Sequence, residues 1–94
     1  MTEISDLKQA KAEIRKWTID FTDDLPSAVT VASAIATHTP PSGVATVPTV
    51  LAASPYVHAT LPAQSVTGLH ILDILATYSD AQKSAVRLNI EIPF

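Results

Sequence analysis

Histidines, adjacent aspartates and serines are the side chains of this sequence that could take part in chemistry. His38, His58 and His70 have no His, Cys or carboxylate neighbours at the short spacings that protein metal sites use. His70 and Asp73 are three residues apart, which places them on opposite faces of a strand or on the same face of a helix. We expect ordinary surface or interface histidines, with no bound metal and no cofactor.

The carboxylates and hydroxyls predict no catalytic site. Asp23 and Asp24 could form an acid–base pair, but adjacent residues in a turn point apart, which favours a solvated turn. The serines lack a Gly-x-Ser-x-Gly motif and an evident partner base. Asp20 has two interpretations, an outward charge on a strand or a carboxylate that bonds a loop or a neighbouring chain. We therefore expect a protein that is not an enzyme.

The distribution of charge constrains the elements that carry these residues. The 94-residue chain is long enough for one domain with a single core. Its residues 25–72, forty-eight in succession, include no Asp, Glu, Lys or Arg. About twelve would be expected at the usual frequency. Because a small domain cannot bury half of its sequence, this segment must face water through Thr, Ser and Ala or face another protein.

Composition also excludes several classes of partner. With six basic residues and a net charge of −3, the chain lacks the clustered Lys and Arg that bind nucleic acid. Prolines interrupt the uncharged segment before any apolar run reaches the length of a membrane span, and the polar N-terminus does not resemble a signal peptide. We expect no nucleic-acid partner, no membrane association and no export by that route. The absence of cysteine excludes disulfides.

The periodicity of apolar residues predicts an N-terminal arm at residues 1–14 and a β-sandwich domain at 15–94. In the arm, Ile4, Leu7, Ala10 and Ile14 recur every three to four residues, which is typical of a short amphipathic helical turn. Such a helix is marginal alone and would need packing to be ordered. The arm is thus expected to be a short helix or an extended segment held by its own domain or by a neighbour.

From residue 15 onward, short β-rich runs alternate with turn residues. Strands are expected near residues 15–21, 29–37, 44–53, 56–61, 69–78 and 85–92. The run at 69–78 is apolar on both alternating faces, so it is either buried on both sides or helical, and we favour a strand at the centre of a sheet. Six to seven short strands favour an immunoglobulin-like β-sandwich. Its expected core residues are Trp17, Ile19, Phe21, Val86, Leu88 and Ile90.

Several local motifs resemble those of small tailed-phage virion proteins with an immunoglobulin-like β-sandwich. The resemblance covers roughly residues 11 to 92. It depends on the strand Trp17-Thr18-Ile19-Asp20-Phe21-Thr22-Asp23-Asp24-Leu25, the uncharged middle, Gly68 and the hairpin Thr77-Tyr78-Ser79-Asp80-Ala81. Ala81 stands where that group usually has glycine, and the doubled glycine common before the penultimate strand is reduced to Gly68. The resemblance implies a non-enzymatic structural component of a phage particle, attached to the head, neck or tail.

The uncharged middle is the segment with functional content, either as a Thr/Ser solvent surface or as a contact surface. Interface cores are depleted of charge, which favours the contact surface. The residues expected to form it are Pro40, Pro41, Val44, Val47, Val50 and Tyr56. We expect a virion protein, made in the host cytoplasm, that binds capsid, neck or tail proteins in many copies or as a homo-oligomer. A capsid decoration protein ranks first and a head–tail component next, with a carbohydrate- or host-binding module of a tail or fibre as the alternative.

Overall fold

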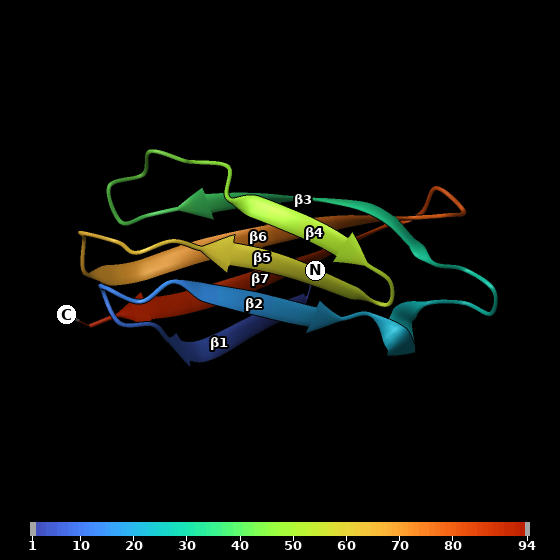
Figure 1. Cartoon of the computed structure of the whole chain (residues 1–94), viewed down its shortest axis with the longest axis horizontal. Helices are drawn as coiled ribbons and strands as arrows, with labels where there is room; N and C mark the ends of the chain where they lie inside the picture. Colours follow the sequence, from blue (N-terminus) through green and yellow to red (C-terminus); the bar gives the residue numbers. More distant parts are fainter. Residues whose placement is uncertain (1, 94) are drawn as a thin grey trace.

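The chain forms two packed β-sheets in a computed structural model that describes residues 2–93 (Figure 1). The predicted all-β, immunoglobulin-like sandwich is confirmed. The strands are β1 (Thr2–Lys8), β2 (Arg15–Asp20), β3 (Val31–Thr39), β4 (Thr49–Ala53), β5 (Tyr56–Leu61), β6 (Gly68–Tyr78) and β7 (Lys83–Ile92). One 3-10 turn, η1 (Thr22–Asp24), follows β2. Among the described residues, no helix is long and apolar enough to cross a membrane.

The order of the strands defines the immunoglobulin-like topology. One sheet has the order β1-β7-β6-β3 and the other has the order β2-β5-β4. All paired strands are antiparallel except β1 and β7, which run parallel. This is the constant-type arrangement of immunoglobulin domains, except that the first strand joins the edge of the opposite sheet.

Residues 2–8 form a strand, so of the two alternatives expected for this segment, a helical turn or an arm, the helical turn is wrong. β1 pairs with β7, and Ile4 lies opposite Leu88. A short isolated helix gains little, whereas pairing with β7 gives this segment backbone hydrogen bonds along one edge. The pairing shifts register between Ile4 and Leu7, where Asp6 adopts a φ of +64°. Leu7 packs against the core.

The core lies between the two sheets and is formed by the inward face of each strand. Ile19, Phe21, Val86, Leu88 and Ile90 are buried there. Trp17 is half-buried and packs against the core edge. Its indole Nε1 donates a hydrogen bond to Oε1 of the buried Gln9 at 2.9 Å, because a buried N–H requires an acceptor.

Two strand predictions differ from the structure. β4 begins only at Thr49, because Pro48 cannot donate to a ladder and residues 44–47 form an exposed connection. β6 occupies the expected central position between β7 and β3, but only its inward face is buried. On its outer face Leu69 is exposed and Ile71 is half-buried, so burial on both sides is wrong for this chain.

Candidate contact surface

One long side of the sandwich is formed entirely by uncharged residues. This uncharged side consists of β3, the connection 40–48 and β4, which together span residues 31–53 without Asp, Glu, Lys or Arg. β3 and β4 are edge strands of different sheets. They are joined where His38 and Thr46 each donate a backbone hydrogen bond to the other at 2.8 Å.

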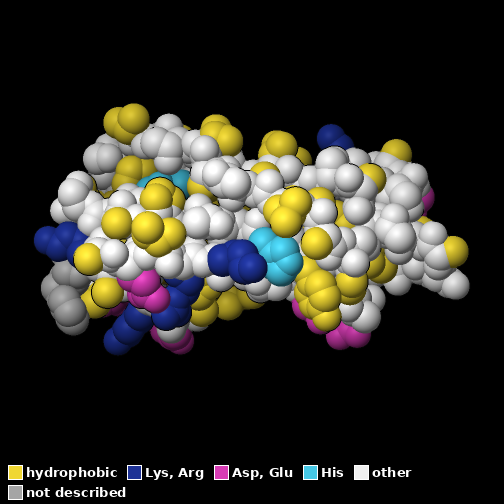
Figure 2. All heavy atoms as spheres, viewed as in Figure 1, with side chains coloured by type: hydrophobic (Ala, Val, Ile, Leu, Met, Phe, Trp, Pro, Cys, Tyr) yellow, Lys and Arg dark blue, Asp and Glu magenta, His cyan; other side chains and the backbone are white. Residues whose placement is uncertain are grey.

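The opposite long side carries charge. There the edges of β1 and β2 approach each other, and residues of both strands line one shallow cleft of about 260 Å³. The charged residues of these strands and of their connection are Glu3, Asp6, Lys8, Lys11, Glu13, Arg15, Lys16 and Asp20. Figure 2 shows most of the charged side chains along the lower margin, whereas the upper margin is mostly hydrophobic and uncharged and carries a Lys or Arg group in this view.

Four large apolar side chains project from the uncharged side. Val47 and Val44 in the connection are 82% and 70% exposed, and Ile35 on β3 and Leu51 on β4 are each 62% exposed. Ile35 and Leu51 point from the outer faces of two different sheets, so they lie on opposite faces of the sandwich and flank its uncharged edge. Apolar surface at this exposure is free to be covered by another protein.

The structure brings together four of the six residues expected to form the contact surface. Pro40, Pro41, Val44 and Val47 share the connection 40–48, although Pro40 is half-buried. Val50 is half-buried and packs against the core.

Tyr56 begins β5, beyond the β4–β5 turn, and thus lies at the other end of β4 from the connection 40–48. Ile35 and Leu51 belong to the exposed group but were not predicted. They could have been identified from the sequence as apolar residues at the positions of an alternating strand whose side chains point to solvent.

A tight turn fixes the base of the connection. The Gly43 N–H donates to the Pro40 carbonyl at 2.9 Å, and Gly43 has a φ of +84°, which glycine adopts without a Cβ penalty. Pro41 lies over Gly68 at the start of β6, so closely that a Cβ added to Gly68 would be 3.0 Å from Pro41 Cγ. The connection is therefore held against the sandwich at its first turn.

A pair of buried histidines anchors the other part of the connection. The expectation of ordinary surface or interface histidines is wrong for His38 and His70, which are 3% and 0% exposed. His38 Nε2 lies 2.8 Å from His70 Nδ1, and the planes of the two rings are nearly parallel, with an interplanar angle of 12°. His38 Nδ1 lies 3.2 Å from Thr46 Oγ1, and His70 Nε2 lies 2.8 Å from the Val66 carbonyl. Burial, and then the neighbouring His70, lower the pKa of His38.

The predicted turn carboxylates make structural hydrogen bonds. Asp20 Oδ1 accepts hydrogen bonds from the hydroxyl and the backbone N–H of Thr22, which lower the pKa of Asp20. The Tyr78 hydroxyl donates to Asp24, and the pKa of Tyr78 is raised by burial and by this bond. Asp23 is exposed. Asp23 and Asp24 thus form no acid–base pair.

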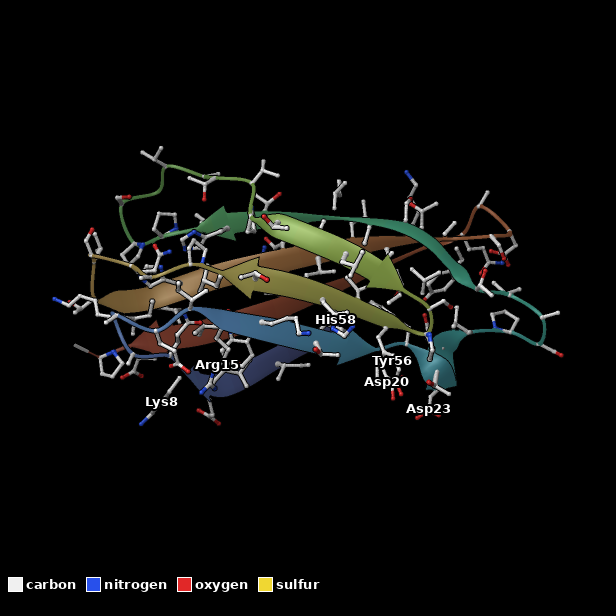
Figure 3. The ribbon with its side chains drawn as sticks, viewed as in Figure 1. Lys8, Arg15, Asp20, Asp23, Tyr56 and His58 are labelled. Carbon is white, nitrogen blue, oxygen red and sulfur yellow. The ribbon has the colours of Figure 1, made fainter. Side chains whose placement is uncertain are left out.

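The outer face of the three-stranded sheet presents one exposed aromatic residue. Tyr56 stacks on His58 with ring centroids 6.2 Å apart, and Asp20 is its cross-strand neighbour. Figure 3 shows Asp20 and Tyr56 together at one end of β2 and β5, with Lys8 and Arg15 at the other end. His58 Nδ1 is 2.8 Å from the Thr18 hydroxyl. Within residues 2–93, no group of three His, Asp or Glu side chains could hold a metal ion.

Comparison with known proteins adds no relative to this description. No family model matches the chain, and no curated protein matches its sequence.

Proposed function

We propose that this protein is a non-enzymatic structural component of a phage particle that binds the particle surface in many copies. A capsid decoration protein ranks first, and a component of the head–tail junction ranks next. The observation that supports adhesion is the uncharged side, where two edge strands and their connection expose Val44, Val47, Ile35 and Leu51. The resemblance of residues 11 to 92 to small phage virion proteins supports the choice of particle.

The uncharged side has the properties of an interface core. Such cores are depleted of charged groups, which cost free energy to desolvate. A standard interface buries about 800 Å² on each partner, roughly 15% of the 5363 Å² surface of this chain. One long side of the sandwich can supply that area. Burial stabilises the contact by about 25 cal/mol per Å² before the costs of association are subtracted.

Matched lysine substitutions test which side adheres. Val44 and Ile14 are both 70% exposed, but Ile14 lies in the β1–β2 connection, among the charged residues. Purified protein is mixed with capsids that lack it, and bound copies are counted. Val44→Lys should weaken binding by about tenfold or more because it places an unpaired charge in the contact, while Ile14→Lys should leave binding unchanged. Equal effects of the two substitutions, or failure to bind heads, tails or itself, would overturn the proposal.

A carbohydrate- or host-binding module is the second candidate. The exposed Tyr56, stacked on His58 beside Asp20, offers a ring and a carboxylate of the kind that sugar sites use. A glycan screen distinguishes the two functions. Specific glycan binding that Tyr56→Ala abolishes and Val44→Lys preserves would favour this candidate over particle adhesion.

A further inference from the structure

The hydrogen bonds of His38 and His70 define a single arrangement of protons. The Val66 carbonyl can only accept, so His70 Nε2 must carry a hydrogen. In a neutral ring His70 Nδ1 is then an acceptor, and His38 Nε2 must donate to it. His38 Nδ1 in turn accepts from the Thr46 hydroxyl. Every ring nitrogen is satisfied when both histidines are neutral.

An added proton disrupts this arrangement. A hydrogen on His70 Nδ1 would require His38 to carry its own hydrogen on Nδ1, because otherwise two hydrogens would face each other across 2.8 Å. A hydrogen on His38 Nδ1 could be accepted by Thr46 only after its hydroxyl rotates, and the charge would then sit on a side chain that is 3% exposed. Burial of an unpaired charge is costly, so the closed arrangement favours neutral rings.

The elements that carry the pair supply no counter-ion. β3, the connection 40–48, β4 and the connection 62–67 contain no Asp, Glu, Lys or Arg. On β6, Asp73 lies on the outer face and is bonded to Arg87 of β7, with 2.7 Å between Arg87 Nε and Asp73 Oδ1. Glu91 of β7 lies opposite Leu69, also on the outer face.

The neighbouring strands of the other sheet supply no counter-ion to the histidine pair either. His58, the histidine of β5, points outward, and its Nδ1 lies 2.8 Å from the Thr18 hydroxyl. Lys11, in the β1–β2 connection, is exposed and meets the connection 62–67 only through its carbonyl, which accepts from Gln64 N–H at 2.9 Å. The Glu13 carboxylate in that connection is bonded to Arg15 at 2.7 Å. A positive charge on the pair would therefore be uncompensated.

We propose that His38 and His70 form a proton-sensitive latch that ties the connections 40–48 and 62–67 to the sandwich at neutral pH and releases them in acid. The His38 ring adds a side-chain bond to Thr46 beside the two backbone bonds between these residues, and His70 holds the second connection through the Val66 carbonyl. Release would free the segment that carries the exposed Val44 and Val47. The latch is a property of the fold and does not depend on the proposed function.

Thermodynamic linkage gives the expected size of the response. In the open state His38 titrates near its ordinary pKa of about 6.5, whereas in the closed state burial lowers the pKa of His38. Between pH 7.5 and pH 5.0, the open population should rise by up to about 30-fold as the opened His38 takes up a proton.

Amide hydrogen exchange measures this opening directly. Protection factors, corrected for the intrinsic effect of pH, are compared at pH 7.5 and pH 5.0 for the backbone amides of His38 and Thr46. Both should lose protection several-fold, up to about 30-fold. The Phe21 amide, bonded to the Pro55 carbonyl at 2.9 Å near the β4–β5 turn, should change much less.

Variants distinguish the latch from general acid destabilisation. H38Q/H70Q removes both rings of the latch and should reduce the response to less than twofold, while H58Q should retain the full response. An unchanged response in H38Q/H70Q, or equal losses at Phe21 and Thr46, would overturn the proposal. If the double variant does not fold, nitrogen NMR of the wild-type histidines decides. His38 and His70 must then both be neutral, with hydrogen on Nε2, at pH 7.5, and any other form overturns the latch.

Discussion

The β6–β7 hairpin contains an alanine in a conformation that suits glycine. Ala81 has a φ of +72°, and its N–H donates to the Tyr78 carbonyl at 2.9 Å, while the Tyr78 N–H donates to the Gln82 carbonyl at 2.8 Å. This is a tight turn followed by a left-handed residue, a common three-residue hairpin connection. A Cβ in the left-handed region costs about 1–2 kcal/mol. Glycine loses about 0.5–1 kcal/mol more than alanine in chain entropy. Ala81→Gly should therefore stabilise the fold by about 0.5–1 kcal/mol.

Ala85→Gly is the matched control for this prediction. Ala85 lies on β7 opposite Leu75, in extended backbone, so the same change there should destabilise by about 0.5–1 kcal/mol. Thermal unfolding followed by circular dichroism measures both. For a domain of this size, 1 kcal/mol shifts the midpoint by about 4–8 °C. Ala81→Gly should raise the midpoint by about 2–8 °C, and Ala85→Gly should lower it by a similar amount.

A second alanine allows the reasoning to be refuted independently. Ala28 has a φ of +65° in the turn where the Val29 N–H donates to the Pro26 carbonyl at 3.1 Å. Ala28→Gly should also raise the midpoint. If both glycine substitutions in the turns lower the midpoint as Ala85→Gly does, relief of left-handed strain does not govern these turns.

Gly68, Gln9 and pH provide tests of other parts of the structure. Gly68→Ala should destabilise by about 1–3 kcal/mol in urea unfolding, because φ is +121° and the new Cβ would lie 3.0 Å from Pro41 Cγ. Gln9→Ala should cost about 1–3 kcal/mol, followed by Trp17 fluorescence, because it removes the acceptor of the Trp17 N–H. The lowered pKa of His38 means that the unfolded chain binds more protons than the folded one below about pH 6.5. The contribution of His38 to the free energy of unfolding should therefore be fully present above that pH and should decline as the pH drops toward the folded-state pKa of His38.

Each of these predictions has a contradicting result. A neutral Gly68→Ala would show that Pro41 moves aside freely. A neutral Gln9→Ala would show that water replaces the buried amide at no cost. Equal unfolding midpoints at pH 7.5 and pH 5.0 for the wild type, with H58Q as the control, would show that burial of His38 does not couple folding to protons.

The strands with clear alternation could be predicted from the sequence. β5 has the predicted bounds Tyr56–Leu61, and β7 presents Val86, Leu88 and Ile90 to the core as its pattern indicates. Alternation is a local property, since successive side chains of a strand point to opposite faces wherever the strand lies. The first strand could not be predicted in this way, because residues 2–8 become extended only by pairing with β7 at the other end of the chain.

The histidine pair shows the same limit at the level of single side chains. His38 and His70 are 32 residues apart in sequence, and nothing in their flanking residues indicates that they meet. They meet because β3 and β6 pair antiparallel and place both rings on the inward face. Val50 and Tyr56 also belong to the uncharged segment, but both are separated from Val44 and Val47. The Val50 side chain packs against the core, and Tyr56 lies at the far end of β4 from the connection 40–48.

The sequence by itself determined that this is a β protein with an uncharged middle, because alternation, turn residues and composition are written in neighbouring residues. Only the tertiary structure decided where the missing charges matter. Strand order places β3 and β4 at the same edge of the sandwich and β1 and β2 at the other. A stretch of sequence without charged residues therefore becomes an uncharged side of the molecule. Hydrogen bonds between strands that are far apart in the sequence determine this strand order, and no local sequence pattern predicts those bonds.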